Sequence, residues 1–337
     1  MIVFAARRLV QAIAVVLAVA FVAFLVSQYV GDPVSTMVGV DTPAAERAAL
    51  RERLGLDDPA PVRFLRYVGN GLRGDFGLSY RTGQPVLGLI ASRMPATLEL
   101  SLAATLLAVV LGVLLGVYTG LRRRGALPRL VLTASLVGVS LPTFLTGILL
   151  IWVFSVQCRS WTAGLPWASS VCMPSFGRGE VVRLGFWSTG LLTASGLKAL
   201  VLPGITLGLF QLTLIMRLVR AEMLEVLRTD HIRFARARGL TDRAVNFGHA
   251  LKNTLVPVIT VVGLQLGSII AFAIITETVF QWPGMGQLFL TSVQFADIPV
   301  ITTYLVLVAL VFVGINLAVD LLYYLVDPRL RLGRGTG

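Results

Sequence analysis

The chain has 337 residues, of which 56% are hydrophobic, and its mean hydropathy is +0.82. This composition excludes a soluble globular protein of this size and indicates an integral membrane protein. The formal net charge of +12 comes without aromatic residues interleaved among the basic ones, so no nucleic-acid partner is expected. Basic residues beside apolar segments instead indicate membrane topology and attraction to anionic membrane lipid.

Six uncharged apolar segments are long enough to cross about 30 Å of hydrocarbon as helices. We predict membrane-spanning helices at 9–31, 100–121, 130–158, 199–216, 255–276 and 298–319. A further apolar run, 184–197, is too short to span and is expected to be interfacial or re-entrant. No convincing cleavage site follows the first span, so we expect it to be retained. The predicted fold class is an all-α polytopic membrane protein.

Basic residues also predict the orientation, because cytoplasmic loops are enriched in Lys and Arg. Most of the 29 basic residues lie on one side if both termini are cytoplasmic. The loop 217–254 and the tail 320–337 are then cytoplasmic, whereas 32–99, 159–198 and 277–297 are extracytoplasmic. The expected localisation is the inner or plasma membrane of the cell, crossed several times.

Small residues and prolines predict local features of the spans. Gly112, Gly116 and Gly120 recur every four residues on one face of the second span, a pattern typical of close helix packing in membranes. Pro142 interrupts the third span and predicts a kink beside a cavity. Pro203 and Gly204 predict an irregular start of the fourth span.

The extracytoplasmic segments carry two further signals. Alternating charges at helical spacing over 43–55 predict a short solvated helix, which either covers the pore or docks an external partner. Cys158 and Cys172 are the only cysteines, and both lie at the loop 159–198. An oxidising compartment permits a disulfide there, so we predict that they pair. Two unpaired thiols at the membrane boundary are the alternative.

The cytoplasmic loop 217–254 has a punctuated pattern. Asp230 is a good N-cap, about two helical turns follow to Arg238, and Gly239 is suited to end the helix in the left-handed conformation. A second helix is expected behind a cap at Thr241 or Asp242. A solvated basic loop is the alternative. It would account for the charges but not for an N-cap at Asp230 followed by a helix-ending glycine at Gly239.

Several enzyme motifs are missing from the sequence. The only lysines, Lys198 and Lys252, each follow a leucine, so the phosphate-binding Gly-Lys-Ser/Thr is lacking. His231 and His249 have no cysteine nearby, so no metal site is expected. Neither a Gly-x-Ser-x-Gly nor a His-Glu-x-x-His motif occurs. We therefore expect the chain not to be an enzyme.

Several stretches resemble the permease subunits of binding-protein-dependent ABC importers, specifically the dipeptide/oligopeptide branch. They are EMLEVL (222–227), DHIRFARARGL (230–240), HALKNTLVP (249–257), RMPATLEL (93–100), SLPTF (140–144), ETVFQWPGMG (277–286), DLLYY (320–324) and DPR (327–329). The general signature of these importers is Glu-Ala-Ala followed by a glycine, and this chain has only its second alanine, as Ala235, and its glycine, as Gly239. The proline that ends the signature is Pro257, at the longer spacing of the peptide branch. The resemblance covers nearly the whole chain.

This resemblance implies a type I ABC importer permease architecture, in which a coupling helix docks in a cleft of a separate ATPase subunit. The coupling helix would comprise Asp230, His231, Ile232, Arg233, Phe234, Ala235, Arg236, Ala237, Arg238 and Gly239. Among the apolar residues, Ile232, Phe234 and Leu227 are expected to anchor it. The implied partners are a second homologous permease, two ABC ATPase subunits or domains that bind ATP and Mg, and an extracytoplasmic substrate-binding protein. No cofactor is expected in this chain.

Polar residues of the spans are candidates for the translocation path. They are Gln211, Gln265, Ser268, Thr276, Glu277 and Asn316. Ionisable groups near the spans are costly in lipid and should face protein or water. For Glu277 we favour a structural role, because a carboxylate beside a glycine-rich turn can accept hydrogen bonds from backbone N–H groups.

The expected function is uptake of di- or oligopeptides delivered by the external binding protein. A broad, weakly polar cavity without fixed mid-membrane charges suits varied peptide side chains, whereas nickel favours nitrogen donors in a defined geometry. Nickel or glutathione carried by the same architecture is the alternative. A secondary transporter that needs no ATPase is a further alternative, although it would usually show hydropathy repeats and charged relays in mid-span.

Overall fold

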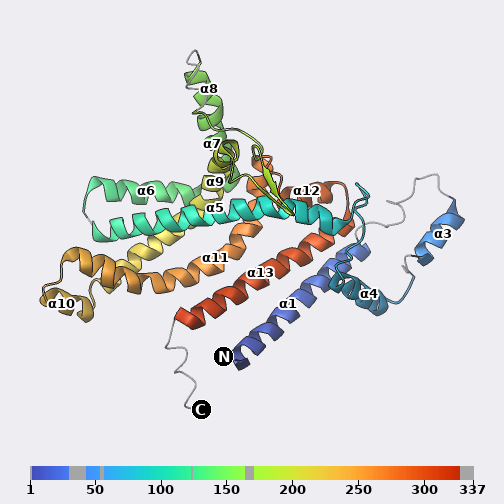
Figure 1. Cartoon of the computed structure of the whole chain (residues 1–337), viewed down its shortest axis with the longest axis horizontal. Helices are drawn as coiled ribbons and strands as arrows, with labels where there is room; N and C mark the ends of the chain where they lie inside the picture. Colours follow the sequence, from blue (N-terminus) through green and yellow to red (C-terminus); the bar gives the residue numbers. More distant parts are fainter. Residues whose placement is uncertain (1, 30–42, 54–56, 123, 164–170, 327–337) are drawn as a thin grey trace.

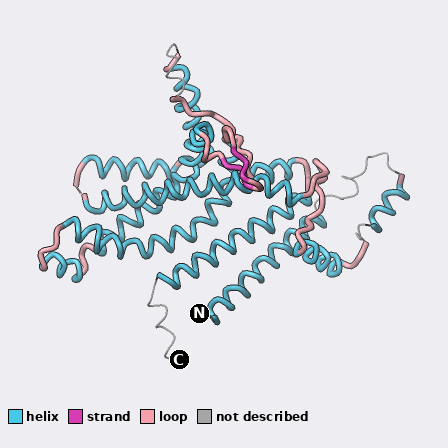
Figure 2. Tube along the Cα trace, viewed as in Figure 1, coloured by secondary structure: helices cyan, strands magenta, loops and turns pink. Residues whose placement is uncertain are grey.

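A computed structural model describes residues 2–29, 43–53, 57–122, 124–163 and 171–326 (Figure 1). The described chain is mostly helical, with one small β-hairpin (Figure 2). The helices are α1 (Ile2–Tyr29), α3 (Ala44–Arg53), α4 (Ala60–Leu72), α5 (Val86–Leu121), α6 (Ala126–Ser140), α7 (Thr143–Ile151), the π-helical η1 (Trp152–Gln157), α8 (Cys158–Trp161), α9 (Ala194–Val226), α10 (Asp230–Ala237), the π-helical η3 (Ala244–Ala250), α11 (Leu251–Val279), α12 (Met285–Gln294) and α13 (Ile298–Val326). The antiparallel hairpin pairs β1 (Val182–Leu184) with β2 (Trp187–Thr189).

Within the described residues, six helical segments are long and apolar enough to cross a membrane. They are Ala6–Gln28, Val86–Leu121, Thr143–Trp161, Ala194–Val226, Pro257–Val279 and Ile298–Val319. The predicted all-α polytopic class is therefore confirmed. The solvated helix expected near residue 43 corresponds to α3, and α1 packs along α13 at one side of the bundle (Figure 1).

The third apolar segment is broken rather than kinked. Helix α6 ends at Ser140 and α7 begins at Thr143, with Pro142 as an extended N-cap at φ −56° and ψ 140°. Proline disfavours helical dihedrals at the residue before it, here Leu141, and cannot donate a helix hydrogen bond. As a result α6 lies beside α5, whereas α8 points away from the helices (Figure 1).

The boundaries around the fourth span also differ from those expected. The run 184–197 forms the hairpin from the end of β1 through β2 and the first turn of α9. Its place relative to the membrane stays a prediction. Helix α9 then continues through Pro203, so the prediction of an irregular start is wrong. A buried helix tolerates an internal proline because the surrounding packing offsets the lost hydrogen bond.

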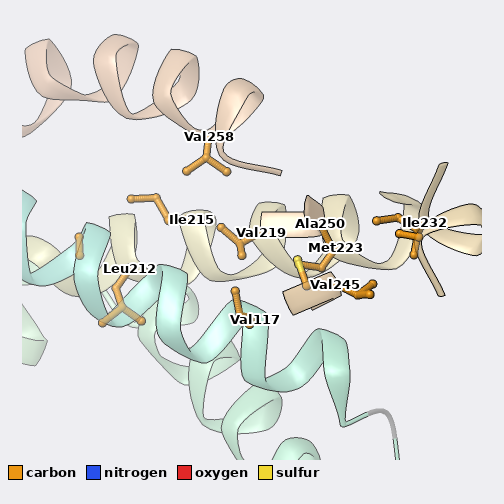
Figure 3. Close-up of a cluster of buried hydrophobic side chains, with 11 residues drawn as sticks. Val117, Leu212, Ile215, Val219, Met223, Ile232, Val245, Ala250 and Val258 are labelled. Carbon is orange, nitrogen blue, oxygen red and sulfur yellow. The ribbon is translucent and has the colours of Figure 1, made fainter. Parts of the chain in front are cut away.

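The α5–α9 contact is the most extensive between any two described helices. A Cβ atom built on Gly112 would lie 3.0 Å from Ile215 Cβ, and one on Gly116 would lie 2.6 Å from Val219 Cβ. The glycine stripe therefore packs against α9, as the four-residue spacing predicts. Figure 3 shows this contact where Val117 of α5 faces α9.

We expect Gly116→Ala to destabilise the protein. The added methyl would also come 2.8 Å from the backbone oxygen of Met216, so α9 must move away, and overpacking of this kind costs about 1–3 kcal/mol. Gly88→Ala in the same helix is the matched control, because its Cβ meets nothing within 4 Å and alanine favours helix by about 1 kcal/mol. Thermal unfolding of the purified protein measures both, and equal stability of the two variants would contradict the packing argument.

Candidate functional site

A short helix, α10, lies at the far end of α9, at the left of Figure 1. It begins at Asp230 with Thr229 as N-cap, one residue before the predicted cap. The Asp230 carboxylate instead pairs with Arg233 at 3.2 Å. The Thr229 hydroxyl makes no cap bond to a backbone N–H of α10. It donates to the Val226 carbonyl at 2.6 Å and lies 3.0 Å from His231 Nδ1.

The end of α10 and the next helix start follow the sequence pattern. Gly239 has φ +79°, a conformation that glycine adopts without strain. Its N–H donates to the Arg236 carbonyl at 2.9 Å, which closes the last turn. The Thr241 hydroxyl then accepts from the Ala244 N–H at 3.4 Å, so Thr241 rather than Asp242 acts as the second cap.

One face of α10 is buried in its own chain. Ile232 is fully buried and Ala235 nearly so, in a cluster with Met223 of α9 and Val245 of η3 (Figure 3). His231 Nε2 also lies 3.1 Å from Asn253 Nδ2 of α11. The expectation that Ile232 anchors a partner is therefore wrong, since its side chain holds α10 against α9 and α11.

The opposite face of α10 is open. Phe234 is 63% exposed, and the Arg238 guanidinium lies 5.7 Å from the centre of its ring. Asp230 and Arg233 are exposed on the same side, whereas Leu227 is half-buried against the core. This face is a single aromatic side chain surrounded by charged ones, which is the composition of a small docking surface. We call Asp230, Arg233, Phe234 and Arg238 the α10 docking face.

Some candidate path residues lie together between α9 and α11. Gln211 Nε2 donates to Gln265 Oε1 at 3.4 Å, and the Gln211 Oε1 atom is buried without a hydrogen-bond partner. Ser268 is half-buried one turn further along α11. Asn316 lies apart from them, in a small pocket with Gln11 of α1, and donates to the carbonyl of its own helix at Phe312.

Glu277 and Thr276 lie at the end of α11 and are fully buried. One Glu277 oxygen accepts from the Thr97 hydroxyl at 2.6 Å, and the other accepts from the Gln287 N–H at 3.0 Å. Gly286 is held close, because a Cβ there would lie 3.0 Å from this second oxygen. The carboxylate thus joins α5, α11 and α12, which is the structural role favoured from the sequence.

A buried ion pair was missed by the sequence analysis. Arg178 Nη2 donates to Glu99 Oε2 at 2.5 Å and to the Ser188 carbonyl at 2.6 Å. The Trp187 indole N–H donates to the other Glu99 oxygen at 3.2 Å. A carboxylate beside an apolar span was a usable signal, since it requires a partner. This pair fastens the loop that carries the hairpin onto α5.

The same loop contains the disulfide that the sequence predicts. Cys158 of α8 and Cys172 are bonded, with their Cα atoms 5.7 Å apart. Among the residues that the structure describes, no group of three or more His, Cys, Asp or Glu side chains is placed to hold a metal ion. The six apolar helices of the described chain define the class as a polytopic helical membrane protein, and the short helix α10 follows the fourth of them.

Comparison with known families gives the assignment within that class. Residues 108–332 match the family described as "Binding-protein-dependent transport system inner membrane component", and residues 1–102 match the N-terminal family of the same membrane components. The chain therefore belongs to the binding-protein-dependent transport system inner membrane component family. It is a multi-pass protein of the cell membrane, as expected from its sequence.

Curated relatives match over nearly the full length. The chain is 37% identical to the dipeptide transport system permease protein DppB of Alkalihalophilus pseudofirmus, over 98% of this chain and 100% of the relative. It is 40% identical to the di/tripeptide transport system permease protein DppB of Pseudomonas aeruginosa, over 97% and 98%. It is 38% identical to the probable D,D-dipeptide transport system permease protein DdpB of Escherichia coli, over 96% and 95%.

A solved structure supports the fold. An inward-facing MetNI methionine ABC transporter chain aligns with a TM-score of 0.52 at 20% identity, covering 71% of this chain and 96% of that chain. At this identity the likeness concerns the fold alone. It agrees with the permease architecture expected from the sequence.

We expect Gly239→Val to abolish energised uptake by the assembled transporter without preventing membrane insertion. A β-branched residue at φ +79° costs about 1–3 kcal/mol of strain and would misshape the end of α10. Gly239→Asn should retain more activity, because asparagine tolerates this conformation.

Gly248→Val is the control for Gly239→Val, since Gly248 lies in η3 with no atom within 4 Å of its Cβ position and with an ordinary φ. Uptake is measured in vesicles that contain equal amounts of each variant. Normal uptake by Gly239→Val would contradict the role assigned to this turn.

Proposed function

We propose that the chain is one of two permease subunits of an ATP-driven importer that takes up di- and oligopeptides. The observation that carries this proposal is the near-full-length match, at 37–40% identity, to permeases named for dipeptide or di/tripeptide transport. An extracytoplasmic binding protein delivers the peptide, and a second, homologous permease completes the path. Nothing is transported by this chain alone.

Energy for uptake comes from two ATPase subunits, which bind ATP and Mg. Both termini and α10 lie in the cytoplasm in this proposal, so the α10 docking face meets an ATPase. Because Ile232 lies in one buried cluster with Met223 of α9 and Val258 of α11, a push on α10 passes to both spans as a rigid-body movement. Tilting of these spans alternates access to the path.

The path lies where α9 and α11 meet the second permease. Gln211 and Gln265 supply amide groups there without a fixed charge, which suits peptides of varied side chains. Affinity and selectivity then rest mainly on the binding protein. Nickel and glutathione remain the substrates against which this proposal is tested.

We expect Phe234→Ala to weaken ATPase association while leaving the stability of the permease unchanged. The ring is 63% exposed, so its removal takes little from the core, whereas an aromatic anchor at an interface is worth about 2 kcal/mol or more. Ile232→Ala should do the reverse and destabilise the permease by about 2–5 kcal/mol, because it empties a fully buried position.

Phe186→Ala is the control for Phe234→Ala, because this aromatic is 89% exposed and belongs to the hairpin, which lies away from α10 (Figure 2). The measurements are copurification of the ATPase subunits and thermal unfolding. Stoichiometric ATPase retention and full uptake with Phe234→Ala would show that the α10 docking face does not bind the ATPase.

For the substrate, we expect the reconstituted complex to accumulate labelled dialanine in an ATP-dependent manner. Unlabelled di- and tripeptides should compete, and nickel ion should neither accumulate nor compete. A complex with an ATPase inactivated at its phosphate-binding lysine is the control for leakage. Nickel accumulation without competition from peptides would overturn the peptide proposal and retain the importer.

A further inference from the structure

A pocket of about 330 Å³ lies where the loop before α5, the first turns of α5, α12 and the start of α13 converge. This is the end of the helices opposite α10 (Figure 1). Most of its lining side chains are polar. Those used below are Ser79, Arg81, Arg93, Gln287, Thr291 and Asp297.

Arg81 and Arg93 place two guanidinium groups in the lining of this pocket. Within the described ranges, neither Arg81 nor Arg93 forms an ion pair. The Arg81 guanidinium lies 4.0 Å from the centre of the Phe295 ring, a cation–π contact that positions the group without neutralising its charge. Arg93 is half-buried in the second turn of α5, so its charge is only partly exposed to solvent.

Two acidic groups in the neighbourhood of these arginines have hydrogen-bond donors of their own. Asp297 is 2% exposed and accepts from the Ser79 hydroxyl at 2.5 Å and from the Tyr80 N–H at 3.0 Å. Glu277 lies close enough to feel the charge of Arg93, but its oxygens accept from Thr97 and from the Gln287 N–H. Asp297 keeps its negative charge, so the lining carries two guanidinium groups against one carboxylate. Among the described residues, these guanidinium groups have no hydrogen-bond acceptor.

We propose that this pocket binds the C-terminal carboxylate of the peptide, an inference that rests on the proposed function. Guanidinium groups form paired, charge-assisted hydrogen bonds with carboxylates, which are stronger than neutral ones. Gln287 and Thr291 of α12 line the same pocket and offer polar groups for the adjoining peptide bond. A terminal carboxylate is shared by all free peptides, so its recognition is independent of side-chain sequence.

The test uses the complete transporter in lipid nanodiscs without the binding protein. Saturation-transfer NMR measures binding of dialanine and of its C-terminal amide. Dialanine should bind and be displaced by acetate. The amide should bind about ten- to a hundredfold more weakly, because it loses a charge-assisted hydrogen bond worth about 1.5–3 kcal/mol.

Variants locate the binding to the pocket. Arg81→Gln and Arg93→Gln should each weaken dialanine binding about tenfold, and the pair Arg81→Lys with Arg93→Lys should retain part of it because the charges remain. Arg73→Gln, at an exposed position just after α4, is the matched control and should bind as the unaltered complex does. Thermal unfolding of each complex identifies any variant that has lost its fold.

Equal binding of dialanine and its amide, or unchanged binding in the double Arg→Gln variant, would overturn this proposal. If that complex still imports peptides, the proposed function stands. A complex that imports no peptide but binds acetate through both arginines would still contain a carboxylate site. This result would overturn the proposal that the ligand is a peptide. The pocket could instead hold a carboxylate of the docked binding protein. In that case the unaltered complex would not bind dialanine, and the double variant would bind the binding protein more weakly. This result would overturn the assignment to the peptide.

Discussion

The close contact between α5 and α9 is the interaction on which the rest of the structure depends. Apolar helices gain little from meeting each other in lipid, so their association relies on van der Waals contact, and small residues permit the closest approach. Ala104, Ala108, Gly112, Gly116 and Gly120 supply such residues at every fourth position of α5. The contact continues through Met223 into the cluster that holds α10. Helix α10 is therefore attached to the pair of spans with the most extensive contact.

Polar interactions fix the opposite end of the bundle. Glu277 joins α11 to α5 and α12, and Glu99 joins α5 to the loop of Arg178. A buried ion pair gives little net stability, because removing two charges from water offsets their attraction, but breaking it leaves an unpaired charge. Both carboxylates thus favour one arrangement of the loops over others. The apolar contact between α5 and α9 thus stabilises the bundle, whereas the hydrogen bonds of Glu99 and Glu277 determine how the loops are arranged at its end.

The sequence predicted features that depend on local pattern. Apolar length gave the polytopic helical class, and the spacing of Gly112, Gly116 and Gly120 gave the packing face. The sequence did not predict contacts between residues that are far apart along the chain. Helical spacing shows that the side chains of Ile232 and Phe234 point in different directions, but it does not show that Ile232 faces the core of its own chain. Arg178 and Glu99 are 79 positions apart in the sequence, so no local pattern predicts that they pair. The break at Pro142 was predicted only as a kink because proline allows both outcomes.

The break between α6 and α7 divides one apolar segment into two mechanical bodies. Helix α6 is held to α9, since Thr213 donates to the Ser135 carbonyl at 3.2 Å. Helix α7 packs on both α9 and the end of α11, where a Cβ at Gly147 would lie 3.4 Å from the Thr206 side chain and 3.1 Å from the Phe280 ring. Leu141 and Pro142 lie between these two helices, outside the residue range of either. A hinge at these two residues would therefore cost neither helix its internal hydrogen bonds.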